Sequence, residues 1–363
     1  MKNMMPYRSF IISLIAFILF SCAKQSSKKI EIRGIYGNPK PFWEKQMKLN
    51  QLGVNAVFVH SGSISQDMIS QARLEGLSVF AEFPTLNGKD YVDEHPEAWA
   101  INEKGEQVEA ASWFMGVCPT EPGFRQYRMD QLRGLLTKFD LDGIWMDYVH
   151  WHAQFEEPEP ILPETCFCDH CLERFEQESN LQIPDGTIPE KAQWILNNVD
   201  KKWRDWRCQV IFEWASDMKS IIKEIKPGTL LGLYHCPWND DEFNGARRRI
   251  LGLDYDLLRP VIDVFSPMVY HGRMGRGPEW VKENITWFCK RLEINEGDYP
   301  KVWPIVQAYN DPETISGEEF ETVLKGGMSG KSSGVMMFTT YAVAEDTVKT
   351  MVMKKVYEDV INK

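Results

Sequence analysis

The stretch LDGIWMDYVHWH, from Leu141 to His152, begins with a short apolar run and ends in Asp147, with aromatic residues and histidines directly after it. A short apolar run of this kind is typical of a strand that is buried on both faces of a sheet. A carboxylate at the end of such a strand costs free energy unless it is paired or used. Asp147 is therefore the first candidate for a functional residue.

Seven further runs of this type occur along the chain, separated by segments with helical spacing. In EPGFRQYRMDQLRGLLTKF and WRDWRCQVIFEWASDMKSIIKEI, for example, apolar residues recur every three or four positions. Such alternation predicts parallel strands joined by helices, and eight units predict an α/β fold of the (β/α)8 TIM barrel type. We expect the strands to end near Tyr36, His60, Glu82, Asp147, His235, Tyr270, Gln307 and Tyr341.

The first residues have the pattern of a signal peptide. Lys2 and Arg8 precede an apolar run from Phe10 to Phe20 that is too short to span a bilayer comfortably. The sequence LFSC resembles the bacterial lipoprotein processing box, in which the cysteine, here Cys22, becomes lipidated. We predict a signal peptide over 1–21, a tether over 22–29 and a single barrel over 30–363, lipid-anchored in the bacterial cell envelope, periplasmic or at the outer surface. An uncleaved membrane anchor is the alternative.

Composition limits the class of substrate. With 43% hydrophobic residues in 363, the chain can bury a large core. The formal net charge of −11 disfavours a polyanion such as nucleic acid. A neutral substrate is expected, and contact with a membrane is expected only through the lipid anchor.

The spacing of the predicted elements is regular except after the fourth strand, where an insertion over about 152–200 is rich in Pro, Glu and Cys. Its segment CFCDHCLERF places Cys166, Cys168 and Cys171 close together, and thiolates at this spacing can bind zinc. Cys118 or His170 would be the fourth ligand. A disulfide and free thiols are the alternatives. A closed structural zinc site would stiffen the loop without taking part in catalysis.

The C-terminal ends of barrel strands line the active site of such a fold. The predicted ends are rich in aromatic residues and histidines and include an amide and a few carboxylates, which suits a sugar, because aromatic rings pack against its C–H faces and polar groups bind its hydroxyls. The alternative is that these aromatic residues belong to the core. We expect the substrate to contact Tyr36, His60, His150, His235, Trp238, Tyr270, Gln307 and Tyr341.

Cleavage of a glycosidic bond needs two carboxyl groups, so Asp147 needs a partner. Glu82 ends the neighbouring third strand, and adjacent strands lie about 4.8 Å apart, so Glu82 is the first choice. Asp147 could instead cap a helix or pair with an arginine. The other candidates for the second carboxylate follow later strands and are Asp240, Asp241, Glu242, Asp311 and Glu345.

The histidines near the strand ends allow a second interpretation, a metal-dependent barrel hydrolase. Such a site usually has a His-x-His pair on the first strand and an aspartate on the last. Here the first strand has no histidine, and His150 and His152 follow the fourth strand instead.

Several motifs together suggest a family. RGIYGN, AEFPTLNG, VCPTEPGFRQY, DLDGIWMDYVHWH and CFCDHCLERF resemble TIM-barrel glycoside hydrolases of the hypothetical, family-10-like group, from about Ile30 onward. DGIWMD is also similar to the fourth-strand segment of α-L-fucosidases and α-galactosidases, whose nucleophile matches Asp147. The chitinase-type acid is absent, because Val149 stands two residues after Asp147. The resemblance implies hydrolysis of O-glycosidic bonds of a glycan or oligosaccharide, with no cofactor required. A non-catalytic glycan-binding lipoprotein is the remaining alternative.

Overall fold

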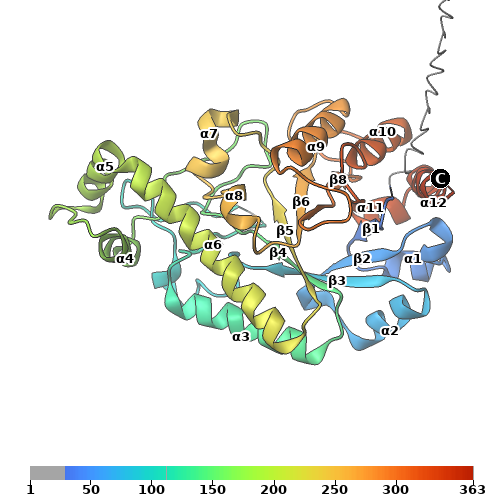
Figure 1. Cartoon of the computed structure of the whole chain (residues 1–363), viewed down its shortest axis with the longest axis horizontal. Coiled ribbons are helices and arrows are strands. Elements are labelled where there is room, and N and C mark those ends of the chain that lie inside the picture. Colours follow the sequence, from blue (N-terminus) through green and yellow to red (C-terminus); the bar gives the residue numbers. More distant parts are fainter. Residues whose placement is uncertain (1–28, 112, 363) are drawn as a thin grey trace, which may run out of the picture.

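Parallel strands form one closed barrel in the computed structural model, which describes residues 29–111 and 113–362 (Figure 1). β7 and β8 are separated by Trp303 and Pro304 and share one position between β6 and β9, so the barrel is eight strands around. Pro304 has no backbone N–H to donate, which explains the interruption. The strands are β1 (Ile32–Tyr36), β2 (Ala56–His60), β3 (Ser78–Pro84), β4 (Gly143–Asp147), β5 (Leu230–His235), β6 (Val264–Val269), β7 (Lys301–Val302), β8 (Ile305–Gln307) and β9 (Gly334–Phe338).

The predicted (β/α)8 barrel is confirmed, and helices cover its outer surface (Figure 1). The predicted signal peptide, most of the tether and Cys22 lie outside the described residues. The helices are α1 (Lys40–Glu44), α2 (Gln66–Leu74), α3 (Pro122–Lys138), α4 (Asp169–Ser179), α5 (Ile188–Asn198), α6 (Asp200–Ile225), α7 (Glu242–Arg249), α8 (Tyr255–Leu258), α9 (Glu279–Arg291), α10 (Gly317–Gly327), α11 (Thr340–Ala344) and α12 (Thr347–Ile361), with 3-10 turns η1 (Leu49–Leu52), η2 (Ser61–Ser63) and η3 (Pro96–Ala98).

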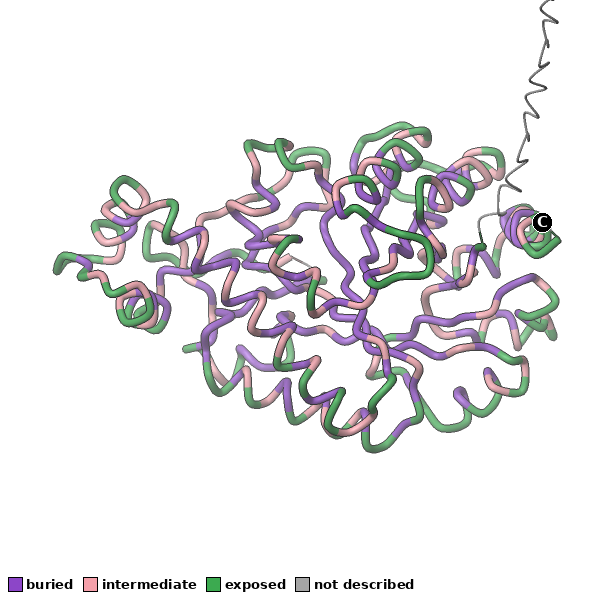
Figure 2. Tube along the Cα trace, in the orientation of Figure 1, coloured by how far each residue is buried: buried purple, intermediate pink, exposed green. Residues whose placement is uncertain are grey.

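Aromatic side chains fill the interior of the barrel, which is buried throughout (Figure 2). The rings of Phe80 and Trp145 lie 4.8 Å apart, and those of Trp145 and Trp303 lie 5.6 Å apart. Trp145 also donates a hydrogen bond from Nε1 to Ser266 at 2.9 Å. Gly232 faces this indole, where a Cβ atom would come within 2.2 Å of the ring. This packed layer lies in the barrel below the C-terminal ends of the strands.

Two long connections follow neighbouring strands on the same face of the barrel. The predicted insertion after β4 contains α4 and α5, which extend away from the barrel beside the first half of α6 (Figure 1). A second long segment, 85–121, joins β3 to α3, so the expectation of a single irregular connection was wrong. The two connections touch, because Phe167 donates a backbone hydrogen bond to Ile101 at 2.9 Å and Asn102 pairs with Thr165.

Within the described part of the chain, no helix has both the length and the apolar character that crossing a bilayer requires.

Removing the indole of Trp145 should weaken the barrel far more than removing an indole at its rim. We expect Trp145→Ala to lower the free energy of unfolding by roughly 3 to 5 kcal/mol, because it opens a cavity and leaves Ser266 without its donor. Urea denaturation gives the value. Trp113→Ala is the matched control, since Trp113 is 38% exposed. Equal losses in both variants would contradict this account of the core.

Candidate active site

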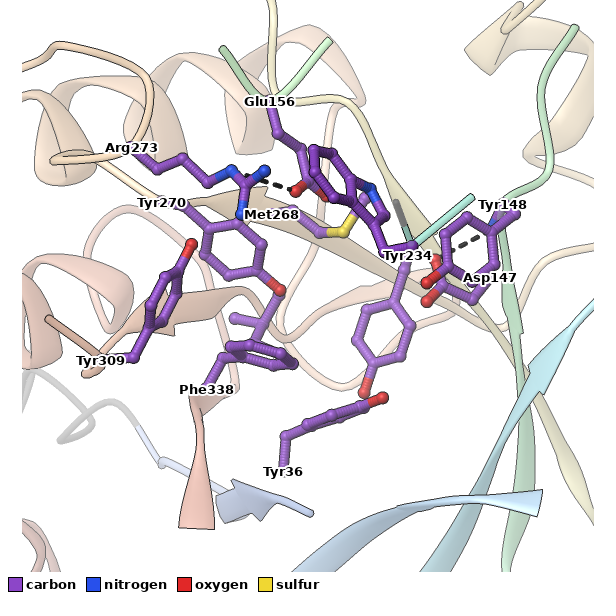
Figure 3. A pocket seen from close by; sticks show the side chains of 12 residues that line it. Tyr36, Asp147, Tyr148, Glu156, Tyr234, Met268, Tyr270, Arg273, Tyr309 and Phe338 are labelled. Atoms are coloured by element: carbon purple, nitrogen blue, oxygen red, sulfur yellow. Dashed lines mark hydrogen bonds and ion pairs between the residues drawn. The ribbon is translucent and has the colours of Figure 1, made fainter. Parts of the chain in front are cut away.

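A cavity of about 230 Å³ opens at the C-terminal ends of the strands (Figure 3). Its wall is mostly aromatic, but it also contains two carboxyl groups and one guanidinium. The strands contribute Tyr36, Asp147, Tyr234, Met268, Ile305 and Phe338. Residues from the connections that follow the strands complete it, namely Trp113, Tyr148, Glu156, Tyr270, Arg273 and Tyr309.

Asp147 is the last residue of β4 and lines the cavity, as the sequence led us to expect. Its Oδ1 accepts a hydrogen bond from the backbone N–H of Tyr148 at 2.8 Å. Tyr148 has a φ of 56°, an uncommon left-handed conformation for a tyrosine, and its ring stacks on Phe114. The pKa of Asp147 is raised to about 7, mainly because the carboxyl group is buried. The hydrogen bond from the Tyr148 N–H lowers the pKa by a smaller amount, and the nearby Glu156 contributes to raising it.

Glu156 is the second carboxyl group in the cavity, and sequence reasoning missed it. It comes from the insertion after β4, and its Oε2 lies 3.5 Å from Nε of Arg273 (Figure 3). Burial raises the pKa of Glu156 to about 7, although Arg273 acts in the opposite direction. The sequence around it, FEEPEP, has the composition of a solvated loop. The feature of the sequence that could have identified Glu156 is the pair of glutamates, Glu156 and Glu157, that precedes a proline shortly after Asp147.

Glu82 lies beneath the cavity wall and does not line it. The register between β3 and β4 pairs Glu82 with Trp145, whereas Asp147 pairs with Pro84. Glu82 is 1% exposed, and its Oε2 accepts a hydrogen bond from the hydroxyl of Tyr36 at 3.2 Å. Burial raises the pKa of Glu82 well above its usual range, and the charge of Asp147 adds to this effect.

The three histidines that were predicted to contact the substrate do not line this cavity. His60 is 51% exposed and lies 3.8 Å from Glu82, outside the cavity lining. His150 lines a small neighbouring cavity, and burial lowers its pKa to about 4, so it is neutral at pH 7. His235 is buried, and its Nδ1 lies 2.9 Å from the hydroxyl of Tyr255. Tyr234 lines the cavity in place of His235, because successive side chains of a strand point to opposite faces.

Two of the remaining predicted contacts line the cavity, Tyr36 and Tyr270. Trp238 is buried against aromatic neighbours outside the lining. The buried amide of Gln307 bonds to backbone groups of the loops beside the cavity. Tyr341 is 67% exposed, because the last strand ends at Phe338 and Tyr341 lies on α11 instead.

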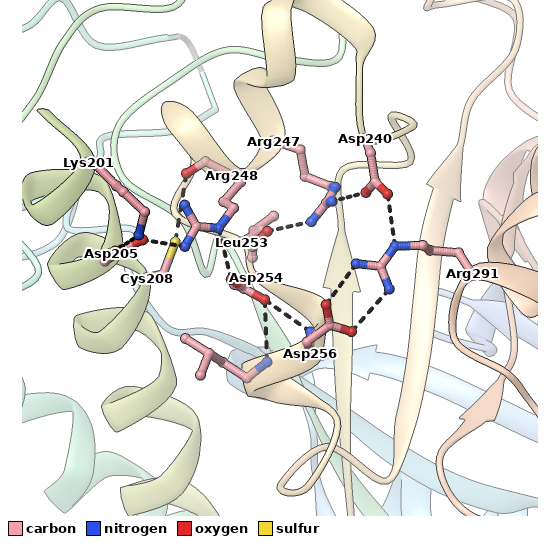
Figure 4. Close-up of polar contacts among 11 residues, drawn as sticks. Lys201, Asp205, Cys208, Asp240, Arg247, Arg248, Leu253, Asp254, Asp256 and Arg291 are labelled. Atoms are coloured by element: carbon pink, nitrogen blue, oxygen red, sulfur yellow. Dashed lines mark hydrogen bonds and ion pairs between the residues drawn. The ribbon is translucent and has the colours of Figure 1, made fainter.

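The other candidates for a second carboxylate lie outside the cavity lining. Asp240 pairs with both Arg247 and Arg291 in a surface network of ion pairs (Figure 4). Glu242 lies 2.7 Å from Arg276. Asp241 is exposed and directly precedes α7. Asp311 forms an ion pair with Arg273 at 3.7 Å, and Glu345 forms one with Lys45 at 2.9 Å.

Four cysteines come together where the two long connections meet. The sulfur atoms of Cys118, Cys166, Cys168 and Cys171 all lie within 4.8 Å of one another. Cys118 Sγ is 3.4 Å from Cys171 Sγ and 3.5 Å from Cys168 Sγ. With Zn–S bonds of about 2.3 Å, a tetrahedral site has sulfur atoms about 3.8 Å apart. The cluster can therefore hold a metal ion, with Cys118 as the fourth ligand in place of the exposed His170.

No other group of three or more metal-binding side chains occurs in 29–111 and 113–362. His150 and His152 are not joined by a carboxylate or a further histidine in such a group. The ligand set that a metal-dependent hydrolase would need at the strand ends is therefore not assembled by the described residues.

Asp147 should make stability depend on pH. A buried acid with a raised pKa keeps its proton when the unfolded chain has lost it, so between about pH 4 and 7 the folded state binds more protons and the free energy of unfolding falls as pH rises. We expect Asp147→Asn to be more stable than the unmodified protein by roughly 1 to 3 kcal/mol at pH 8, and by little at pH 4. Urea denaturation at both pH values measures this.

The control for this measurement is Asp359→Asn, which changes an exposed aspartate on α12. Its effect should be small and the same at both pH values. A stability difference for Asp147→Asn that does not change between pH 4 and pH 8 would contradict the raised pKa.

No family model and no curated protein sequence matches this chain. Solved structures match its fold. The β-galactosidase of the psychrophilic Marinomonas ef1 has a TM-score of 0.66 at 12% identity, and the match covers 90% of this chain and 59% of that one. The PgaB (BpsB) glycoside hydrolase domain from Bordetella bronchiseptica has a TM-score of 0.64 at 11% identity, covering 89% and 98%. The α-L-fucosidase isoenzyme 2 of Paenibacillus thiaminolyticus has a TM-score of 0.56 at 14% identity, covering 91% and 49%.

This chain thus spans less than two thirds of the galactosidase and about half of the fucosidase. At such identities the likeness shows the fold alone. The chain has the barrel fold of these glycoside hydrolases.

Proposed function

We propose that this protein is a glycoside hydrolase that cleaves an O-glycosidic bond of a glycan or oligosaccharide with two carboxyl groups, Asp147 and Glu156. The observation that carries the proposal is that both groups line one aromatic cavity at the strand ends and both have a pKa of about 7. Such values allow one group to hold a proton near neutral pH while the other is ionised. The fold of the structural neighbours supports the same class of reaction.

In the proposed mechanism Asp147 acts from the floor of the cavity. It is held by β4 and by the N–H of Tyr148, which stabilises its charged form. It either attacks the anomeric carbon or takes a proton from the attacking water. Glu156 lies in the loop above the strand ends and gives its proton to the departing oxygen as the C–O bond breaks. The aromatic side chains pack against the sugar ring.

This assignment differs from the pairing of Asp147 with Glu82 that the sequence favoured. Glu82 is covered by Tyr36, so a sugar in the cavity would meet the tyrosine first. We assign Glu82 a supporting role, in which its buried carboxyl orients the hydroxyl of Tyr36.

The proposed substrate is a carbohydrate, which fits a cavity with many tyrosine hydroxyls and a chain with a net charge of −11. For location we propose the cell envelope with a lipid anchor on Cys22, which rests on the sequence of residues 1–22 alone.

We further propose that the cysteine cluster holds a structural zinc ion. Four sulfurs leave no open position for a substrate, so the ion would not take part in the reaction. It would tie the β3–α3 connection, which carries Trp113, to the insertion, which carries Glu156. The thiols come from both segments, so binding would fix two walls of the cavity at once.

The roles of the two carboxyl groups can be separated by leaving-group chemistry. On an unactivated substrate found by glycan screening, we expect Glu156→Gln to reduce kcat/KM by about 10² to 10⁴-fold. On the matching dinitrophenyl glycoside, whose leaving group departs without a proton, its loss should be small. Asp147→Asn should abolish hydrolysis of both substrates while binding of the sugar, measured by calorimetry, is retained.

Glu82→Gln is the comparison variant for this experiment. If it shows the leaving-group dependence and Glu156→Gln does not, the acid is Glu82 and our assignment is wrong. Unchanged hydrolysis in Asp147→Asn would remove the proposed mechanism. Sugar binding with no cleavage of any glycoside would favour a glycan-binding protein.

The zinc proposal predicts one zinc per chain by elemental analysis of the purified protein. Cys171→Ser should lose the metal and unfold at a lower temperature, because binding of the ion contributes to folding. Cys208→Ser is the control, since Cys208 is a buried thiol outside the cluster. Absence of zinc, together with an intact mass that shows disulfide bonds among the four cysteines, would overturn the proposal.

A further inference from the structure

Arg273 joins several of the loops around the cavity. It follows β6, and its guanidinium lies 4.5 Å from the centre of the Trp113 ring. Its Nη2 is 2.8 Å from Glu157 Oε1 and its Nη1 is 3.7 Å from Asp311 Oδ2. Trp113 belongs to the β3–α3 connection, Glu157 to the insertion after β4, and Asp311 to the loop after β8. We call these four residues the clasp.

The buried side chain of Gln307 holds the backbone of the clasp in place. The backbone N–H of Arg273 donates to Gln307 Oε1 at 3.1 Å, and the amide nitrogen of Gln307 donates to the carbonyls of Tyr309 and Asp311. Gln307 is completely buried, so this connection is shielded from water. The side chain of Arg273 is only 16% exposed. The arginine is therefore held at its backbone as well as at its guanidinium, and three carboxylates surround it, since Glu156 is the third.

Two residues of the clasp, Trp113 and Arg273, line the cavity, which is small. With loops closed on one another at that side, the space measures about 230 Å³, less than the roughly 300 to 1,000 Å³ of pockets for drug-sized ligands. A single sugar ring with its hydroxyls is smaller than a drug-sized ligand, so its size suits this cavity. Cleavage inside a chain needs more than one sugar unit on the non-reducing side of the broken bond, and therefore a cleft that continues beyond the cavity on that side.

We propose that the clasp makes the protein exo-acting, so that it removes one sugar unit at a time from the non-reducing end of its substrate. The terminal sugar ring occupies the cavity, and the rest of the oligosaccharide extends out of it. This remainder is the leaving group, and it carries the oxygen that Glu156 protonates. This inference rests on the proposed glycoside hydrolase function. It adds the substrate class, a free non-reducing terminal unit, and a role in specificity for Arg273.

The test uses a pair of oligosaccharides of one kind that the protein cleaves, one with a free non-reducing end and one whose terminal unit carries a 4,6-O-benzylidene cap. We expect the free oligosaccharide to release a single monosaccharide from the first turnovers, and the capped one to react at least 100-fold more slowly. Chromatography of the products at early times measures both. A capped substrate that is cut at a similar rate, or early products longer than one unit, would overturn the inference while leaving the hydrolase function intact. Failure to cleave any glycoside would overturn both.

Variants of the clasp give a second readout. Arg273→Ala should raise the ratio of capped to uncapped cleavage at least tenfold, because the side wall opens, whatever the change in overall rate. Arg276→Ala is the matched control, since Arg276 belongs to the same loop but pairs with Glu242 outside the cavity lining. Its ratio should not change. If Arg273→Ala does not fold, Trp113→Ala, at an exposed position, replaces it. An unchanged ratio in the folded clasp variant would contradict the role of the clasp.

Discussion

The register between β3 and β4 determines the chemistry of the cavity. It sets Pro84 beside Asp147 and moves Glu82 one inward position deeper, beside Trp145. The hydroxyl of Tyr36 then covers Glu82, and Asp147 is the one carboxyl group on a described strand that lines the cavity. In the proposed mechanism the second group therefore comes from a connection, as Glu156. A shift of one inward position between these two strands would bring Glu82 level with Asp147.

This arrangement buries three carboxyl groups, which is unfavourable in free energy when they are charged. Glu82, Asp147 and Glu156 all lie where water is largely excluded, and each has a raised pKa for that reason first. The opposing effects are smaller: Arg273 lies beside Glu156, the N–H of Tyr148 donates to Asp147, and the hydroxyl of Tyr36 donates to Glu82. The site therefore stores unfavourable electrostatic energy in the free protein. A fold with a large aromatic core and a long helix, α6, that buries one face can tolerate such a local loss.

The strands could be predicted because each buried strand is a continuous apolar run in the sequence, and the barrel followed from their number and alternation. Which side chain at a strand end faces inward could not be predicted as well, since an error of one residue exchanges the two faces, as with Tyr234 and His235. The loop residues Trp113, Glu156 and Arg273 were missed because their positions depend on contacts between distant segments. Cys118 was predicted only as one of two candidates for the fourth ligand, beside His170, because it is distant in sequence from the other three cysteines that the fold brings it to.

The two proposed catalytic carboxyl groups are attached to the protein in different ways. Asp147 belongs to a strand whose neighbours on both sides hold it in the barrel, whereas Glu156 belongs to a connection that is held by side-chain contacts and a cysteine cluster. The distance between them is therefore a property of the loop and not of the barrel. Separations of about 5 Å and of about 6.5 Å or more lead to opposite stereochemical outcomes in glycoside hydrolysis. In the proposed mechanism, the conformation of the insertion therefore selects between the two outcomes.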